Sequence, residues 1–294
     1  MTSDRTCFAN DLQRDLLDRQ AFTFRHQLLG HPALTLENLG RMIPTLPGTQ
    51  VHYSKGSLQR SDDFDQAQKL HGNGLSIEET IETIRTSDSY IMIRSPQTDA
   101  SFQPLFRDLI GDIEGLMRQR GVGRQAHSPM LYLFISSPHS VTPFHIDRYA
   151  NVLMQIQGTK EIRVFPQWDE RIVPSTVRES VMAQSGKRVE WKPEHEALGT
   201  AFHLAPGDAL HIPLAAGHHV LNGPEVSISL SIFFHTDATR SLSQAMALND
   251  LVRRRTGLPL GAVGRSPLRD AVKAGVWRTG RNLLAALRGR TAST

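Results

Sequence analysis

The segment from Thr142 to Asp147 carries the clearest chemical signal in the sequence, because a histidine and a carboxylate stand two residues apart in it. In a β-strand, side chains two positions apart project from the same face. His145 and Asp147 are therefore placed to bind one metal ion together. An imidazole and a carboxylate need one more histidine to complete the facial triad typical of non-haem Fe(II) sites, which leaves other coordination positions open.

A distant histidine on a neighbouring strand is the expected third ligand. The chain offers His211, His218 and His219, all of which follow a Pro-Gly-Asp turn at residues 206–208. Neighbouring residues in a strand face opposite ways, so at most one of His218 and His219 can join the site. The spacing alone leaves the choice among the three histidines open.

The elements that precede this segment are predicted to be mainly helical over the first 86 residues. A Ser-Ile-Glu-Glu capping box at Ser76 marks the start of one helix. A stripe of apolar residues at helical spacing begins at Phe102 and ends near Gly121. Residues 51–54 and 90–94 are the extended runs expected in this part of the chain.

From about residue 130 the pattern changes to strands. The runs 149–156 and 160–165 flank Gln157-Gly158-Thr159 and are predicted to form a hairpin. Residues 166–200 lack a clear period and are interpreted as an insert between strands. Further short strands are predicted at 130–135, 209–213, 218–221 and 226–234, and helices at 239–255 and 267–288.

The strand predicted at 226–234 alternates serine with large aliphatic residues. Ser227, Ser229 and Ser231 fall on one face and the aliphatic residues on the other. Small polar side chains on one face of a hydrophobic strand suit the lining of a wet pocket inside a barrel.

Three features in order carry a resemblance to a known family. His145-x-Asp147 is followed by Lys160, fifteen residues after the histidine, and then by the sequence from Gly207 to Pro213 with His218 five residues beyond it. Over roughly residues 130–235 this pattern resembles the JmjC-type branch of the cupin superfamily. Within that branch it is most similar to the asparaginyl hydroxylases of hypoxia-inducible factor and to bacterial cupin-like proteins.

The resemblance implies a double-stranded β-helix that uses Fe(II), 2-oxoglutarate and dioxygen. It assigns the third metal position to His218 rather than His219, and it leaves His211 and His219 as packing or supporting histidines. By the same resemblance, Lys160 and Thr142 bind the distal carboxylate of 2-oxoglutarate. Tyr90 is assigned a third contact to this carboxylate.

Two further positions follow from the resemblance. Asn151 matches an asparagine that lies near the metal in the family. Ser231 stands at a cosubstrate-pocket position where the hydroxylases have an asparagine, and Phe233 stands where they have a tryptophan. These departures concern the substrate pocket and leave the metal ligands unchanged.

The fold class that we predict is mainly β with flanking helices (α+β), built on the jelly-roll core. Residues 1–125 are expected to form a mostly helical N-terminal region that packs on the core. Residues 126–237 are expected to form the core itself, and residues 238–294 a basic helical region.

Composition limits the class of protein. One cysteine, Cys7, excludes a disulfide scaffold, and no apolar run suggests a signal peptide or a membrane span, so we expect a cytoplasmic protein.

Residues 252–294 carry a formal charge of +9, against −5 for the rest of the chain. Such a segment can contact nucleic acid or an anionic membrane, but a solvated helical face is the interpretation that we favour.

The favoured function is an Fe(II)- and 2-oxoglutarate-dependent oxygenase, a hydroxylase of a peptide side chain or of a small metabolite. One alternative is a non-enzymatic cupin regulator whose basic tail contacts nucleic acid. Another alternative is a cupin enzyme that needs no 2-oxoglutarate. Such an enzyme would have no need of a cation at the position of Lys160. The resemblance also implies a possible homodimer through the C-terminal helices.

Overall fold

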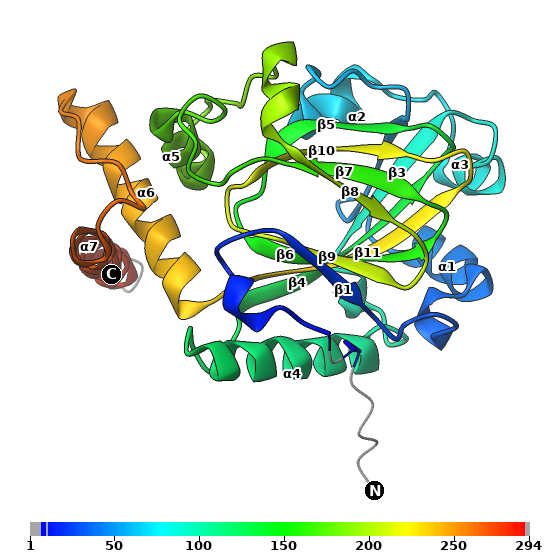
Figure 1. The fold of residues 1–294 in the computed structure, drawn as a ribbon, viewed down its shortest axis with the longest axis horizontal. Helices are drawn as coiled ribbons and strands as arrows, with labels where there is room; N and C mark the ends of the chain where they lie inside the picture. The colour runs from blue at the N-terminus through cyan, green and yellow to red at the C-terminus, as the bar shows by residue number, and fades with distance from the viewer. Residues whose placement is uncertain (1–6, 10, 292–294) are drawn as a thin grey trace, which may run out of the picture.

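The computed structural model describes residues 7–9 and 11–291, except the side chains of 65, 68, 284 and 286–291. The outermost residues of the two predicted terminal regions, 1–6 and 292–294, lie outside this description. Within it, eleven strands form two antiparallel sheets that face one another, with helices around them (Figure 1). This arrangement confirms the predicted fold class, a β core with flanking helices.

The larger sheet has the strand order β1-β9-β6-β11-β4-β3-β2. Its strands are β1 (Phe22–Arg25), β2 (Val51–Lys55), β3 (Ser89–Arg94), β4 (His127–Ser136), β6 (Ala150–Gln157), β9 (Asp208–Ile212) and β11 (Ser227–His235). The smaller sheet has the order β5-β10-β7-β8. Its strands are β5 (Val141–Ile146), β7 (Lys160–Val164), β8 (Thr200–Leu204) and β10 (Gly217–Asn222).

The predicted hairpin around Gly158 is wrong in its pairing, although both strands exist. β6 pairs with β11 and β9 in the larger sheet, whereas β7 pairs with β10 and β8 in the smaller sheet. The turn therefore crosses from one sheet to the other. Gly158 has a φ of +69°, and a β-carbon there would lie 2.6 Å from the carbonyl oxygen of Val226, so a larger residue does not fit.

The N-terminal region contributes strands as well as helices. The expected extended runs become β2 and β3, and the unpredicted β1 pairs with β9 within a stretch expected to be helical. The capping box at Ser76 is present at the start of α3 (Ile77–Glu82), and Gly121 ends α4 (Gln103–Arg120) in the left-handed conformation. The other α-helices described in this region are short, α1 (Leu36–Met42) and α2 (Ala67–Leu70).

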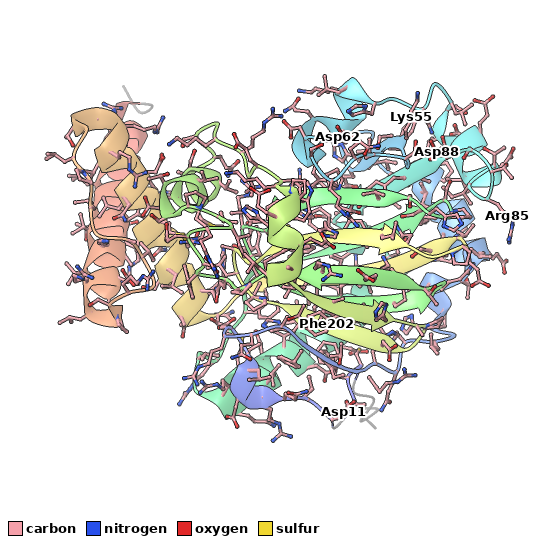
Figure 2. The ribbon with its side chains drawn as sticks, turned by 45° about the horizontal axis from the view of Figure 1, so that its top comes forward. Asp11, Lys55, Asp62, Arg85, Asp88 and Phe202 are labelled. Atoms are coloured by element: carbon pink, nitrogen blue, oxygen red, sulfur yellow. The ribbon has the colours of Figure 1, made fainter. Side chains whose placement is uncertain are left out.

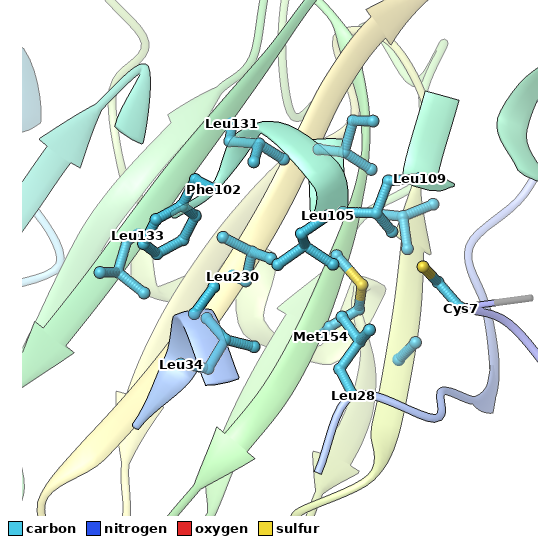
Figure 3. Packing of buried hydrophobic residues seen from close by; sticks show 14 of the residues in the cluster. Cys7, Leu28, Leu34, Phe102, Leu105, Leu109, Leu131, Leu133, Met154 and Leu230 are labelled. Atoms are coloured by element: carbon cyan, nitrogen blue, oxygen red, sulfur yellow. The ribbon is translucent and has the colours of Figure 1, made fainter. Parts of the chain in front are cut away.

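The main hydrophobic core lies between α4 and the outer face of the larger sheet (Figures 1 and 3). Leu105 and Leu109 of α4 are fully buried there, together with Leu230 of β11. Because strand residues alternate, the aliphatic side of β11 faces this core and its serine side faces the space between the sheets. The alternating sequence of β11 thus gives the strand an apolar outer face and a polar inner face.

The insert between β7 and β8 contains one α-helix, α5 (Ser175–Ala183), which packs against α6 (Asp237–Thr256). The strand β8 at the end of the insert was not predicted. The two C-terminal helices α6 and α7 (Pro267–Thr291) pack on each other and stand beside the sheets (Figure 1). Leu268, Val272 and Val276 of α7 are exposed, and the predicted homodimer and anionic contacts of this region stay predictions.

In the described part of the chain, no helix combines the length and the apolar character needed to cross a membrane.

We expect Leu109→Ala to lower the free energy of unfolding by roughly 2–5 kcal/mol, because it leaves a cavity between α4 and the larger sheet. Leu268→Ala is the matched control, since Leu268 is 77% exposed, and it should change stability by less than about 0.5 kcal/mol. Urea unfolding followed by circular dichroism measures both. Equal effects of the two substitutions would contradict the assignment of the core.

Candidate metal centre and cosubstrate pocket

Antiparallel pairing of β5 with β10 brings the two distant histidines together. In this pairing His145 lies directly opposite His218, and their ring centroids are 4.2 Å apart. Asp147 follows β5 and completes the cluster, with one carboxylate oxygen 3.8 Å from Nε2 of His145 and the other 3.6 Å from Nε2 of His218. One ligand atom from each residue lies within 4.8 Å of the others.

Both imidazoles are held with Nε2 directed to the cluster. Nδ1 of His145 lies 2.8 Å from the carbonyl oxygen of Pro143, and Nδ1 of His218 lies 3.0 Å from that of Ala216. A carbonyl oxygen only accepts hydrogen bonds, so each Nδ1 carries the proton and each Nε2 keeps a lone pair for a metal. Burial and the neighbouring His145 lower the pKa of His218 to about 4, which keeps it neutral at pH 7.

Two neighbours orient the other members of the cluster. The side-chain amide of Asn151 donates to Oδ2 of Asp147 at 2.6 Å, which places Asn151 beside the cluster, as the resemblance implied. Phe64 stacks on His145 with ring centroids 4.5 Å apart. Phe64 was not among the predicted site residues, because it lies far upstream in a segment without a recognisable motif.

Lys160 reaches from the smaller sheet to the inner face of the larger one. Its ammonium donates to the hydroxyl of Ser229 at 2.5 Å, and that hydroxyl donates to the side-chain carbonyl of Gln155 at 2.9 Å. Lys160 is only 6% exposed, and burial lowers its pKa to about 7. No carboxylate among the described residues forms an ion pair with it, so the ammonium can still bind an anion.

Sequence reasoning recognised Ser229 as part of a polar strand face but missed its contact with Lys160. It missed Gln155 altogether, since a glutamine in a hydrophobic strand gives no motif. The amide of Gln155 donates to the hydroxyl of Ser227 and to the carbonyl oxygens of residues 157 and 158, so its orientation is fixed. Its carbonyl is therefore left to accept the Ser229 proton, which directs a Ser229 lone pair to Lys160.

The other predicted cosubstrate residues lie around the same space. Tyr90 and Thr142 are buried and their hydroxyls share a hydrogen bond. Ser231 is buried with a hydroxyl that has no partner among the described residues. These three residues, the metal cluster, Lys160 and Asn151 all line one cavity of about 580 Å³. A cavity of this size holds a small keto acid with room for part of a substrate.

The two remaining candidate histidines lie outside the cluster. Nε2 of His211 accepts from the backbone of Asp18 at 3.2 Å, and its Nδ1 lies 3.1 Å from the carbonyl oxygen of Asn151. His219 turns to the opposite face of β10, where its Nε2 lies 3.3 Å from Glu196 and its ring lies 5.1 Å from Trp191 of the insert. Neither contact set includes a member of the cluster, and the role of these two residues as packing or supporting histidines stays a prediction.

Two antiparallel sheets that enclose a His–Asp–His cluster define a cupin. A model of the cupin-like domain family matches residues 48–240, which is more than half of the chain, so this protein belongs to the cupin-like family. The match confirms the resemblance to JmjC-type cupins inferred from the motifs. It also includes β2 and β3, which lie in the region predicted to precede the core.

The relatives found by comparison share the domain at low identity. tRNA wybutosine-synthesizing protein 4 from Emericella nidulans is 31% identical over 160 residues, which is 52% of this chain and 14% of that protein. The X-ray structure of E. coli YcfD aligns with a TM-score of 0.50 and 15% identity, over 88% of this chain and 64% of that chain. The likeness to YcfD shows a shared fold. In both comparisons the chain spans less than two thirds of the relative.

A second YcfD structure is described as a ribosomal oxygenase in complex with cobalt and succinic acid. It aligns with a TM-score of 0.46 and 15% identity, over 88% of this chain and 63% of that chain.

We expect His145→Ala and His218→Ala to abolish stoichiometric Fe(II) binding, because each removes one of three protein ligands. Metal content after anaerobic dialysis against Fe(II) measures this loss. His203→Ala is the matched control, since the His203 side chain is 77% exposed and outside the cluster, and it should keep full occupancy. Loss of metal in His219→Ala, with retention in His218→Ala, would overturn the choice of the third ligand.

Proposed function

We propose that the protein is an Fe(II)- and 2-oxoglutarate-dependent oxygenase, a hydroxylase that uses dioxygen. The observation that carries this proposal is one cavity lined both by a two-histidine, one-carboxylate cluster and by a buried ammonium without a carboxylate partner among the described residues. The donor set fits Fe(II), and the ammonium suits the distal carboxylate of 2-oxoglutarate. Bound Fe(II) would supply the activation of dioxygen.

The side chains of this protein bind and orient in such a reaction. His145, Asp147 and His218 would hold the metal on one face, which leaves positions free for the cosubstrate. Lys160 would bind the distal carboxylate, with Thr142 and Tyr90 as neutral hydroxyl donors beside it. Because the pocket is buried, each of these hydrogen bonds is stronger than it is in water.

The buried ammonium also argues against the two rival functions. A cupin that needs no keto acid has no use for a cation at this depth, because an unpaired buried charge is costly. A purely nucleic-acid-binding protein would use the basic groups of its C-terminal helices, and no described residue of α6 or α7 lines the cavity. The intact cluster, together with Lys160, favours an enzyme.

The proposed substrate is a peptide side chain or a small molecule. The name of one relative refers to tRNA modification. This chain covers 14% of that protein, so the substrate of that protein does not carry over to this chain.

Anaerobic addition of Fe(II) and 2-oxoglutarate should produce the visible metal-to-ligand absorption band of a chelated keto acid. His145→Ala and His218→Ala should abolish the band, and Lys160→Met should weaken 2-oxoglutarate binding, by about tenfold or more for one lost charged contact. His203→Ala should leave the band unchanged. An absent band in metal-loaded wild-type protein would contradict the proposed function.

The affinity for 2-oxoglutarate should decrease above pH 7. The pKa of Lys160 is lowered to about 7 by burial, so the free protein carries the ammonium below this pH and loses it above. Binding of a carboxylate requires the proton, so the dissociation constant should stay level below pH 7 and rise toward tenfold per pH unit above it. Titrations from pH 6.5 to 8.5 measure the profile.

The Lys160→Met variant is the control for this pH profile, because it has no ammonium to lose. Its weaker binding should not vary over the same range. A level profile in the wild-type protein would show that Lys160 does not determine the affinity.

A further inference from the structure

A second group of polar side chains lies on the inner face of the larger sheet, separate from the contacts of Lys160. Arg94 of β3 lies opposite Tyr132 of β4, and Tyr132 lies opposite Ser231 of β11. All three residues line the cavity that holds the metal cluster. The register therefore places a guanidinium, a phenol and a hydroxyl side by side across three neighbouring strands.

Two arginines lie around the hydroxyl of Tyr132. The guanidinium of Arg94 lies 5.8 Å from the centre of the Tyr132 ring and acts electrostatically on its hydroxyl. Arg148, in the loop between β5 and β6, also lines the cavity and acts electrostatically on the same hydroxyl. Burial raises the pKa of Tyr132, so its hydroxyl stays protonated at neutral pH and can donate to an anion.

These two guanidiniums differ from the other arginine that lines the cavity. Arg188 is neutralised by Asp63, at 3.0 Å. Within the described residues, neither Arg94 nor Arg148 has a carboxylate within 4.0 Å. The hydroxyl of Ser231, which is 1% exposed, likewise has no partner there. The site offers positive charge and directed donors, and the carboxylate that acts on the Tyr132 hydroxyl is Asp147 of the metal cluster.

The position of this group separates it from the cosubstrate contacts. Ser231 lies two residues along β11 from Ser229, which binds Lys160. The side chains of Ser229 and Ser231 therefore share a face of the strand and are about 7 Å apart. In the other direction, Phe233 lies opposite Asn151, which binds Asp147. Tyr132, Phe233 and the metal cluster line one cavity, so a molecule held at Tyr132 shares this space with the cluster.

We propose that Arg94, Arg148 and Tyr132 bind an oxyanion of the primary substrate, a carboxylate or a phosphate group. The inference rests on the proposed oxygenase function and names the class of substrate, one that carries such an anion. Two guanidiniums and a phenol match the several acceptor oxygens of either anion. The ring of Phe233, 4.7 Å from that of Tyr132, provides an apolar wall for the adjoining part of the substrate.

Ligand-observed NMR with inorganic phosphate and acetate tests the proposal on the full-length protein. The protein is loaded with Zn(II) and saturating 2-oxoglutarate, which keep the probes away from the metal ligands and from Lys160. Arg94→Gln and Arg148→Gln should each raise the dissociation constant of the bound probe about tenfold or more. Arg94→Lys should recover part of the affinity, because it restores the charge without the planar fork.

Arg85→Gln is the matched control, since Arg85 is exposed at the edge of the molecule (Figure 2) and does not line the cavity. It should change the affinity less than twofold. Tighter binding of phosphate supports a phosphorylated substrate, and tighter binding of acetate supports a carboxylic acid. Failure of both probes to bind, or binding that survives both arginine substitutions, would overturn the proposal.

A separate measurement tests the proposed oxygenase function. Binding of 2-oxoglutarate to the anaerobic, Fe(II)-loaded protein is followed by its own absorption band, without either probe. If that band is absent, the probes are titrated instead into the Lys160→Met variant, in which Arg94 and Arg148 remain. Probe binding there that depends on both arginines would retain the anion site and reject the oxygenase.

Discussion

The register between β5 and β10 is the constraint on which the whole site depends. It sets His145 directly opposite His218, and Asp147 at the end of β5 then lies within reach of both imidazoles. A slip of one residue would turn His218 away and bring His219 inward, because neighbouring side chains in a strand face opposite sides. His219 instead contacts Glu196 and Trp191, so the two faces of β10 each have their own partners.

The two sheets are joined inside the cavity by a polar chain rather than by an ion pair. Lys160 comes from the smaller sheet, and Ser229 and Gln155 receive it on the larger sheet. A neutral acceptor holds the ammonium in place without neutralising it, so its charge stays available to a ligand. The cost of burying this charge is visible in the lowered pKa of Lys160, and a bound carboxylate would offset that cost.

The larger sheet serves two purposes because its two faces differ. Its outer face packs on α4 through fully buried aliphatic residues, which stabilise the fold. On its inner face, residues that lie opposite one another on neighbouring strands form rows, which follow one another at intervals of two residues. Each row has a different neighbour. The row of Ser229 contacts Lys160, the row of Ser231 contains Tyr132 and Arg94, and the row of Phe233 contains Asn151. A single twofold period thus separates the contacts of Lys160, the Tyr132–Arg94 pair and the neighbour of Asp147.

The sequence by itself indicated the family, most of the core strands, the long helices and the pair of His145 and Asp147, because each depends on a local period or on an ordered motif. His218 was assigned by the family resemblance, and the register of β10 against β5 places it opposite His145. The capping box at Ser76 and the glycine at the end of α4 were predictable for the same reason. The pairing of β6 and β7 with different sheets was not, since adjacency along the chain favours a hairpin and a crossover leaves no local signal. Phe64, Gln155 and the Arg94–Tyr132 pair were likewise decided by the tertiary structure alone, because their contacts depend on strand register and on loops folded over the cavity.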